Sequence, residues 1–430
     1  MTLMNQLKKI PAFLSKAKPQ IFILFCSSAA FLTYCSMYAF RKPFTAGTYK
    51  GLSLFGVDYK VALIILQLIG YALSKFIGIK IIAELSPQKR VQTLIVLMGL
   101  AFLSLLGFGL VPYPYNAVFM LLNGLPLGLI WGVVFSFLEG RKFTEILGAF
   151  MASSFMIASG VVKSIGLFLI QQFDVSEQWM PFFAALVFIP ILIIGIWMLS
   201  QIPEPNQEDI ALRTERVPMD AANRKKFFVL FWPGILLVVA IYVGLTVFRD
   251  LRDNFAVELW TELGYLKTPW ILVFAEIPIA IIVLIIIGSM IIIKNNKKAF
   301  YLSISLCIFS GICFLISTYL FDAKYINPIY WMILMGLLMY LPYLIFHTIL
   351  FERWIAFFKY KGNLGFLMYI ADSVGYFGSV LVLLYKNYGT KGFNWLPFFT
   401  TTTWIVGIGI TLLGIAAFVY FKRKETPSID

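Results

Sequence analysis

Apolar runs of about 18 residues or more recur along almost the whole of this chain, which is the pattern of membrane-spanning helices. The 430 residues are 60% hydrophobic and only 13% charged, with a mean hydropathy of +0.87. A soluble domain keeps about 25% charged residues. The sequence therefore predicts an all-α membrane protein.

Twelve spans can be marked, and most are joined by short loops. Their approximate ranges are 21–44, 60–82, 92–111, 115–138, 146–171, 180–200, 229–252, 268–293, 298–320, 328–350, 363–385 and 396–421. The long interval from Gln201 to Lys226 combines three prolines with many charged residues, which is typical of a linker. We therefore expect an N-terminal six-helix bundle over 1–200, a cytoplasmic linker over 201–228 and a C-terminal six-helix bundle over 229–430.

Lysine and arginine are concentrated in alternate loops. The loops at 111–115 and 172–179 contain neither residue, whereas the linker and both termini are rich in them. Basic residues collect on the cytoplasmic side of membrane proteins, so we expect cytoplasmic termini in a multi-pass protein of the cell (inner) membrane. The basic stretch before the first span reads as an uncleaved cytoplasmic lead-in rather than a cleaved signal peptide. The net charge of +14 reflects this pattern and does not point to nucleic acid.

Two arginines occupy matching places in the two halves. Arg41 ends the first span, in Tyr-Ala-Phe-Arg-Lys-Pro-Phe, and Arg249 ends the seventh, in Thr-Val-Phe-Arg-Asp-Leu-Arg. A guanidinium in a bilayer costs about a few kcal/mol and is normally hidden and paired, and its planar fork suits phosphate or carboxylate. Transporters built from two such halves hold substrate near the bilayer midplane. We therefore expect one central anion site that both arginines contact.

Two six-helix halves and a long cytoplasmic linker resemble the major facilitator superfamily. The chain resembles in particular the organophosphate:phosphate antiporter branch, which includes glycerol-3-phosphate and hexose-phosphate transporters. The similarity lies in the Arg41-Lys42 pair flanked by aromatics and in the Tyr-Ala-Leu-Ser-Lys-Phe-Ile run at 71–77. Ser153-Ser154-Phe155-Met156 stands where that branch has a histidine near its phosphate site. The resemblance implies the superfamily fold over nearly the whole chain, in a divergent relative of this branch.

Five further residues are candidates for the substrate site. Lys75 lies in the matched run of the second span, and Lys163, near the centre of the fifth, could replace the missing histidine as a cationic group. Arg252 follows Arg249 by three residues, so the two project from nearly one helical face. The rings of Tyr38 and Tyr71 are expected to line the cavity.

The arginines also have a purely structural interpretation. Arg249 and Arg252 alternate with Asp250 and Asp253, so this helix end could neutralise itself through local pairs. Arg41 could extend to the outer headgroups from its helix end. These alternatives stay open at the level of sequence.

His347 and Asp372 are candidates for ion coupling. His347 is the chain's single histidine, and imidazole titrates near neutral pH; the alternative is a hydrogen-bonded packing histidine. Asp372 is an intramembrane carboxylate that could carry a proton or pair with a nearby cation.

Two charged pairs occupy equivalent cytoplasmic helix ends in the two halves. Glu139 with Arg141, and Glu352 with Arg353, are expected to form a cytoplasmic gate that latches the halves in the outward-facing state. All four cysteines lie in apolar segments without a Cys-x-x-Cys pair, and we expect small packing residues rather than a disulfide or metal site.

No phosphate-binding glycine loop, nucleophile elbow or pair of catalytic carboxylates occurs in the sequence, so we expect no cofactor, no metal and no enzymatic activity. The sequence favours a monomeric secondary transporter of a small organic anion, with a phosphorylated metabolite as the expected class and rocker-switch alternating access as the mechanism. One alternative is a transporter-like membrane receptor that senses a sugar phosphate without transporting it. Another is an intramembrane acyltransferase built on His347, for which no convincing partner residue is present.

Overall fold

The computed structural model describes residues 9–83, 85–139, 141, 143–205, 209, 221–265, 269–358, 364–389 and 394–425. Positions 206–208 and 210–220 of the predicted linker therefore lie outside the described residues. By contacts, the chain divides into an N-terminal unit, Met1–Thr214 with Lys267–Phe274, and a C-terminal unit, Glu215–Leu266 with Ala275–Asp430.

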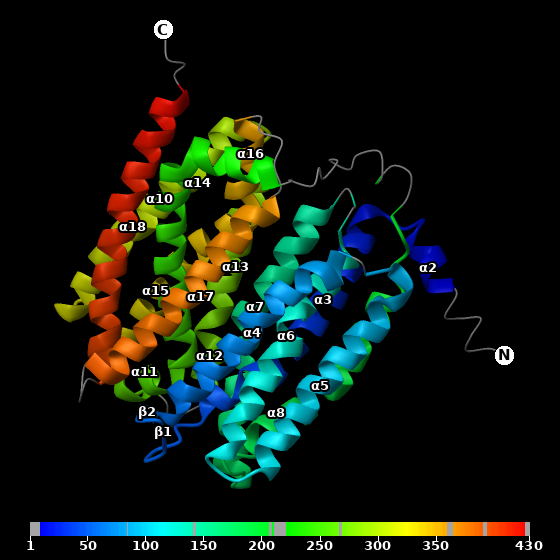
Figure 1. Cartoon of the computed structure of the whole chain (residues 1–430), viewed down its shortest axis with the longest axis vertical. Coiled ribbons are helices and arrows are strands. Elements are labelled where there is room, and N and C mark those ends of the chain that lie inside the picture. The colour runs from blue at the N-terminus through cyan, green and yellow to red at the C-terminus, as the bar shows by residue number, and fades with distance from the viewer. Residues whose placement is uncertain are drawn as a thin grey trace. The chain divides into compact units, whose positions relative to one another are not determined.

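Long helices make up most of both units (Figure 1). In the N-terminal unit they are α3 (Pro19–Arg41), α4 (Tyr59–Ala83), α5 (Arg90–Leu110), α6 (Val118–Ser136), α7 (Thr144–Phe173) and α8 (Met180–Ser200), preceded by the short α2 (Lys9–Leu14). In the C-terminal unit they are α10 (Ala221–Asn254), α13 (Glu276–Ile291), α14 (Asn296–Asp322), α15 (Pro328–Ile345), α17 (Leu364–Gly389) and α18 (Trp395–Glu425).

Shorter elements join or extend these helices. Besides α2, three α-helices of the described residues are short: α11 (Ala256–Glu262), α12 (Ile271–Phe274) and α16 (Phe351–Phe357). Three 3-10 turns, η1 (Pro43–Ala46), η2 (Pro87–Lys89) and η3 (Tyr115–Ala117), and one π-helical turn, η4 (Phe346–Leu350), complete the set. Strands β1 (Ser53–Leu54) and β2 (Val57–Asp58) form an antiparallel hairpin between α3 and α4.

Ten helices in the described part of the chain are long and apolar enough to cross a membrane. The two other predicted spans, 60–82 and 363–385, coincide with α4 and α17, which contain 25 and 26 residues. The prediction of an all-α membrane protein is therefore confirmed, and the hairpin of β1 and β2 is a small addition to it.

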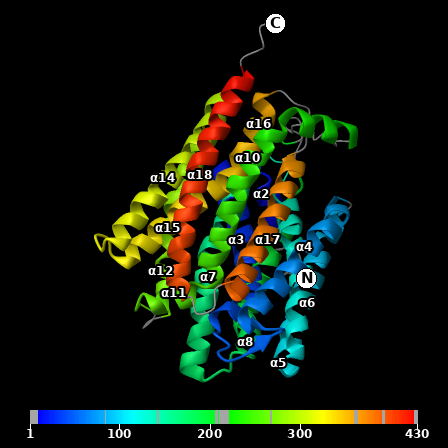
Figure 2. The ribbon, with the colours of Figure 1, turned by 60° about the vertical axis from the view of Figure 1, so that its left-hand side comes forward.

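The same pairs of helices pack together inside each unit. In the N-terminal unit α3 contacts α7 and α8, α6 contacts α4 and α5, and α5 contacts α8. In the C-terminal unit α10 contacts α17 and α18, α15 contacts α13 and α14, and α14 contacts α18; Figure 2 shows α14, α15 and α18 side by side. If the six long helices of each unit are numbered one to six in chain order, the five contacting pairs are the same in both units. The two bundles are therefore pseudosymmetric.

Glycines permit the closest approach between α4 and α6. A Cβ built on Gly124 would lie 2.2 Å from the carbonyl oxygen of Gln67, and one on Gly70 would lie 2.2 Å from the carbonyl oxygen of Leu121. Such distances leave no room for a side chain. Backbone contact through small residues is how helices pack in lipid, where no hydrophobic effect drives them together.

The predicted eighth span is broken into α12 and α13. Pro278 has no N–H to donate to the carbonyl of Phe274, four residues earlier, and its ring crowds that carbonyl. The break at Ala275 also separates the units, because α12 packs on α7 of the N-terminal unit. There Ser164 Oγ donates to the carbonyl of Pro269 at 2.8 Å. The division at 229 predicted from the sequence, which puts this segment wholly in the second half, is therefore wrong for residues 267–274.

Candidate functional site

The end of α3 is held by two amides of the N-terminal unit. Gln67 Nε2 of α4 donates to the carbonyl of Arg41 at 2.9 Å and to Asn123 Oδ1 at 2.8 Å. Asn123 Nδ2 of α6 donates to the carbonyl of Phe40 at 3.1 Å. Pro43 opens the following 3-10 turn, where its fixed φ and missing N–H help to end the α-helix. These contacts fix the backbone that carries the Arg41 side chain.

Arg41, Lys75, Tyr38 and Tyr71 come together as one group, which we call the N-terminal cationic cluster. The Arg41 guanidinium lies 4.2 Å from the centroid of the Tyr71 ring and 5.8 Å from that of Tyr38. The ammonium of Lys75 lies 5.2 Å from the same Tyr71 ring. Arg41 is only 7% exposed, so these cation–π contacts act in a poorly hydrated setting where they are strongest.

Lys163 lies on the part of α7 that faces the end of α3. Its side chain is 2% exposed. Phe155, about two turns earlier on α7, stacks on Tyr38 with ring centroids 6.5 Å apart. A Cβ built on Gly166, about one turn after Lys163, would lie 3.6 Å from the carbonyl oxygen of Pro43. Since positions three residues apart share a helical face, Lys163 belongs to the same region as the N-terminal cationic cluster.

The membrane helices of the N-terminal unit are almost free of acidic residues. From α3 to α8, the helical sequences contain a single carboxylate, Glu145, in the first turn of α7. The same helices carry Arg41, Lys75 and Lys163. Their formal charge is therefore positive, and a low-dielectric interior of that charge attracts anions.

The matching arginine of the C-terminal unit has a different environment. Arg249 donates from Nε and Nη2 to Asp250 Oδ1, at 3.0 and 2.8 Å. Its Nη1 donates to the hydroxyl of Tyr343 on α15, and its guanidinium lies 4.5 Å from the centroid of that ring. The local pairing with Asp250, which the sequence analysis left open as an alternative, is present in the structure.

Arg252 has an acidic partner from another helix. It is 3% exposed and donates to Glu276 Oε1 of α13 at 2.6 Å and to the carbonyl of Met332 at 3.1 Å. Glu276 is not among the residues predicted from the sequence. An acidic residue inside an apolar run was the available signal, because such residues are rare and normally paired.

His347 and Asp372, predicted separately, meet at the hydroxyl of Tyr242 on α10. This hydroxyl donates to Asp372 Oδ1 at 2.5 Å and lies 2.7 Å from His347 Nε2. The distance from His347 Nε2 to Asp372 Oδ1 is 3.9 Å. Tyr242 was not named from the sequence, although it precedes Arg249 by seven residues and so shares its helical face.

The two arginines expected to take part in the cytoplasmic gate contact groups within their own units. Arg141 donates to the carbonyls of Phe137, at 3.4 Å, and of Pro203, and burial lowers the pKa of its guanidinium. Arg353 donates to Asn296 Oδ1 at 2.8 Å. Glu139 follows the end of α6 by three residues, and Glu352 lies in the first turn of α16. The latching role of all four residues remains a prediction.

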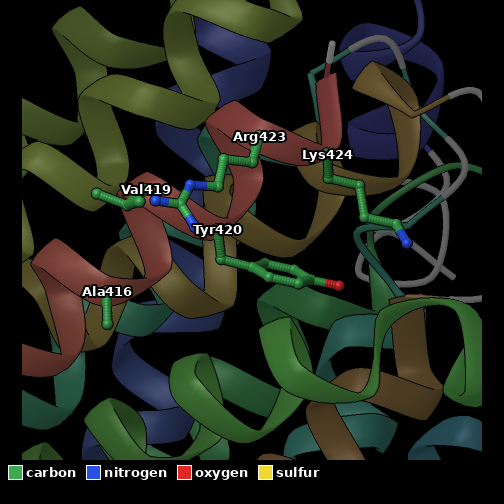
Figure 3. A pocket seen from close by; sticks show the side chains of 5 residues that line it. All are labelled: Ala416, Val419, Tyr420, Arg423 and Lys424. Carbon is green, nitrogen blue, oxygen red and sulfur yellow. The ribbon is translucent and has the colours of Figure 1, made fainter. Parts of the chain in front are cut away.

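A shallow groove lies near the end of α18. It is lined by Ala416, Val419, Tyr420, Arg423 and Lys424 (Figure 3). Helix α18 runs antiparallel to α10: Phe399, near its start, stacks on Phe248, whereas Phe421, near its end, approaches Gly234. The groove therefore lies near the start of α10, and Arg249 lies near its end.

The fold is that of the major facilitator superfamily, as comparison with solved structures shows. A D-xylose-proton symporter matches with a TM-score of 0.60 and 14% identity over 92% of this chain and 96% of that one. A peptide transporter in complex with sulfate matches with a TM-score of 0.62 and 12% identity, over 93% of this chain and 94% of that one. The xylose transporter XylE from E. coli was solved in a partially occluded inward-open conformation. It matches with a TM-score of 0.57 and 13% identity, over 94% of this chain and 98% of that one.

Residues 43–424 match the model of a family of unknown function, DUF5690. The chain belongs to this family. No curated protein matches its sequence.

Proposed function

We propose that this protein is a secondary transporter of a small organic anion, with phosphorylated metabolites as the expected substrates. The N-terminal cationic cluster carries the proposal. It combines a buried guanidinium, an ammonium and two aromatic rings in a unit whose spanning helices hold only one carboxylate. Arginine binds phosphate through two parallel hydrogen bonds, and a ring already stacked on the guanidinium limits its conformational freedom before substrate arrives.

The fold supports transport as the activity. The similar structures described above are named as a symporter and as transporters of xylose and peptides, and an alternating-access mechanism fits two pseudosymmetric bundles. The Arg-Lys pair at 41–42 and the run at 71–77, which resemble the organophosphate:phosphate antiporters, contribute three of the four residues of the cluster. This overlap favours a phosphorylated substrate over a carboxylate.

The first experiment is a thermal-shift screen of the purified protein against phosphate esters, carboxylates and neutral sugars. A ligand at about 100 times its Kd stabilises a protein by about 2.7 kcal/mol, which such a screen detects. We expect stabilisation by phosphate esters, reduced in Arg41→Ala and Lys75→Met. The matched control is Lys386→Met, which removes a cation 4.1 Å from the Trp395 ring in the C-terminal unit. Stabilisation by neutral sugars alone, unchanged in both cluster variants, would refute the proposal.

A receptor without transport remains the second candidate, because it would use the same anion contacts. Flux into proteoliposomes separates the two functions. Transport of the stabilising ester supports the transporter. Binding that depends on Arg41 but gives no flux under any imposed gradient would identify the receptor.

A further inference from the structure

A line of polar groups crosses three helices of the C-terminal unit and is not used by the proposed anion contact. Asp372 of α17, Tyr242 of α10 and His347 of η4 meet at one hydroxyl oxygen, at distances of 2.5 and 2.7 Å. The side chains of His347 and Asp372 are 20% and 19% exposed. They are thus largely, but not completely, buried.

The backbone at His347 is adapted to this position. Helix α15 ends at Ile345 and passes into the π-turn η4, which carries the histidine. π-turns are rare and occur often at functional sites. The wider turn changes the direction in which the residue projects, and here it accompanies contact between the imidazole and residues of a neighbouring helix.

One further hydroxyl connects these three residues to Arg249. The hydroxyl of Tyr343 lies 3.2 Å from that of Tyr242, and the two rings are stacked with centroids 5.3 Å apart. Tyr343 accepts a hydrogen bond from Arg249 Nη1. Helix α10 also contributes Asp250, and α17 contributes Tyr376, 5.9 Å from the Arg249 guanidinium. Tyr343, Arg249, Asp250 and Tyr376 are the charged and titratable neighbours on α10, α15 and α17. Helices α14 and α16 also pack on η4, and α16 carries Glu352 and Arg353.

We infer that Asp372, Tyr242 and His347 form one proton-binding site that couples proton uptake to anion binding at Arg249 of the same unit. The inference rests on the proposed anion transport and adds the coupling ion to it. Without the extra proton, Asp372 is a carboxylate that accepts the Tyr242 proton, and His347 is neutral. Uptake of one proton by the second imidazole nitrogen makes the histidine cationic, and no other bond forms or breaks. The proton belongs to the trio as a coupled unit.

The sign of the coupling follows from formal charge. Before proton uptake, the carboxylates of Asp250 and Asp372 outnumber the single guanidinium of Arg249, so the group is negative by one charge. After uptake it is neutral. A negative group in a poorly screened interior opposes an anion that approaches Arg249 of the same unit, so proton uptake favours anion binding there. By linkage, anion binding favours proton uptake to the same extent, and anion affinity should rise as pH falls.

The single histidine makes the proton site directly observable. Full-length protein labelled with ¹³C at histidine gives one imidazole signal, from His347. We expect this signal to titrate, and its midpoint to move to lower pH by about one unit or more in Asp372→Asn, because a carboxylate about 4 Å away favours the imidazolium. Tyr242→Phe keeps the ring, removes the bridging hydroxyl and should also shift the midpoint. Asp322→Asn, which removes a carboxylate that accepts from Trp404, should leave it unchanged.

Sulfate binding tests the coupling, because sulfate stays doubly charged between pH 6 and 8. We expect wild-type affinity to be about fivefold or more higher at pH 6 than at pH 8, and this difference to disappear in Asp372→Asn. Sulfate binding without pH dependence in the wild type overturns the coupling. If the midpoint of the His347 titration is the same in the wild type, Asp372→Asn and Tyr242→Phe, the proposed proton site is wrong. If sulfate binds at neither pH, both the proposed anion binding and its coupling to protons are wrong. The His347 titration still decides independently whether the proton site exists.

Discussion

At the scale of single residues, Arg41 and Arg249 show how one side chain can have two environments in equivalent helices. Arg41 stacks on Tyr71 among helices that contain one carboxylate, whereas Arg249 is bonded to Asp250 beside it. A cation already neutralised by a carboxylate attracts an external anion less strongly. The two arginines are therefore expected to contribute unequally to anion binding.

The variants Arg41→Lys and Arg249→Lys test this difference. Lysine keeps the charge but loses the planar fork and the stacked geometry, so Arg41→Lys should lose about 1.5–3 kcal/mol of binding free energy, roughly tenfold or more in affinity. Arg249→Lys can still pair with Asp250 and should lose less. Calorimetric titration with the best ester from the screen measures both. Equal losses would show that the contrast in environment does not matter.

The pair of Arg252 and Glu276 should act on stability rather than transport. Removing one partner of a buried ion pair costs about 3–5 kcal/mol, because the other charge stays buried. We expect Glu276→Gln to lower the unfolding temperature strongly. The control is Glu425→Gln in the pair with Lys297, whose side chain is 50% exposed; exposed pairs contribute about 0–1 kcal/mol. Equal stability of the two variants would contradict the structural role of Arg252.

The candidate residues could be predicted from sequence only where they contrast with their surroundings. A charge or a histidine in an apolar run is conspicuous, and so Arg41, Lys75, His347 and Asp372 were found. Tyr242 and Tyr343 were missed because aromatic residues make up 17% of the chain, and a functional ring looks like a packing ring. That Tyr242 bridges two predicted residues depends on the packing of three helices, which periodicity does not determine.

At the scale of elements, hydropathy predicted most helix ends to within a few residues. The predicted span 180–200 coincides with α8, and 298–320 lies inside α14. The departures are local events in the backbone: the break before α13, the π-turn η4, and a start of α10 at Ala221 instead of 229. None of these three departures changes the local composition much. The pattern of apolar residues therefore does not predict them.

The contact between α4 and α6 predicts a position-specific effect of alanine. In Gly124→Ala the added methyl would meet the Gln67 carbonyl, and Gln67 also holds the carbonyl of Arg41. Overpacking costs about 1–3 kcal/mol, so stability and anion affinity should both fall. The control is Gly99→Ala in α5, where no atom lies within 4 Å of the added carbon. A thermal-unfolding series measures both variants, and equal midpoints would disprove the close approach.

At the scale of the whole molecule, the orientation in the membrane is still a prediction from the distribution of Lys and Arg. Two exposed positions test it in a variant without the four native cysteines. Asp174→Cys, after α7, should react with an impermeant thiol reagent added outside cells, and Glu204→Cys, after α8, should react only from inside. The Glu204 side chain is 61% exposed. The opposite labelling pattern would reverse the topology and place the predicted gate outside.

The grouping of Asp372, Tyr242 and His347 around one hydroxyl has an electrical consequence. A trio that takes up one proton per cycle would move one positive charge with each substrate. With a monovalent anion the cycle would then be electroneutral, and the membrane voltage would have no effect on it. With a doubly charged phosphate ester one negative charge would cross, and each 100 mV would change the driving force by about 2.3 kcal/mol. An inside-negative membrane potential would thus oppose uptake of the dianion and have no effect on uptake of the monoanion, so the ionisation state of the substrate would decide whether voltage contributes to the driving force.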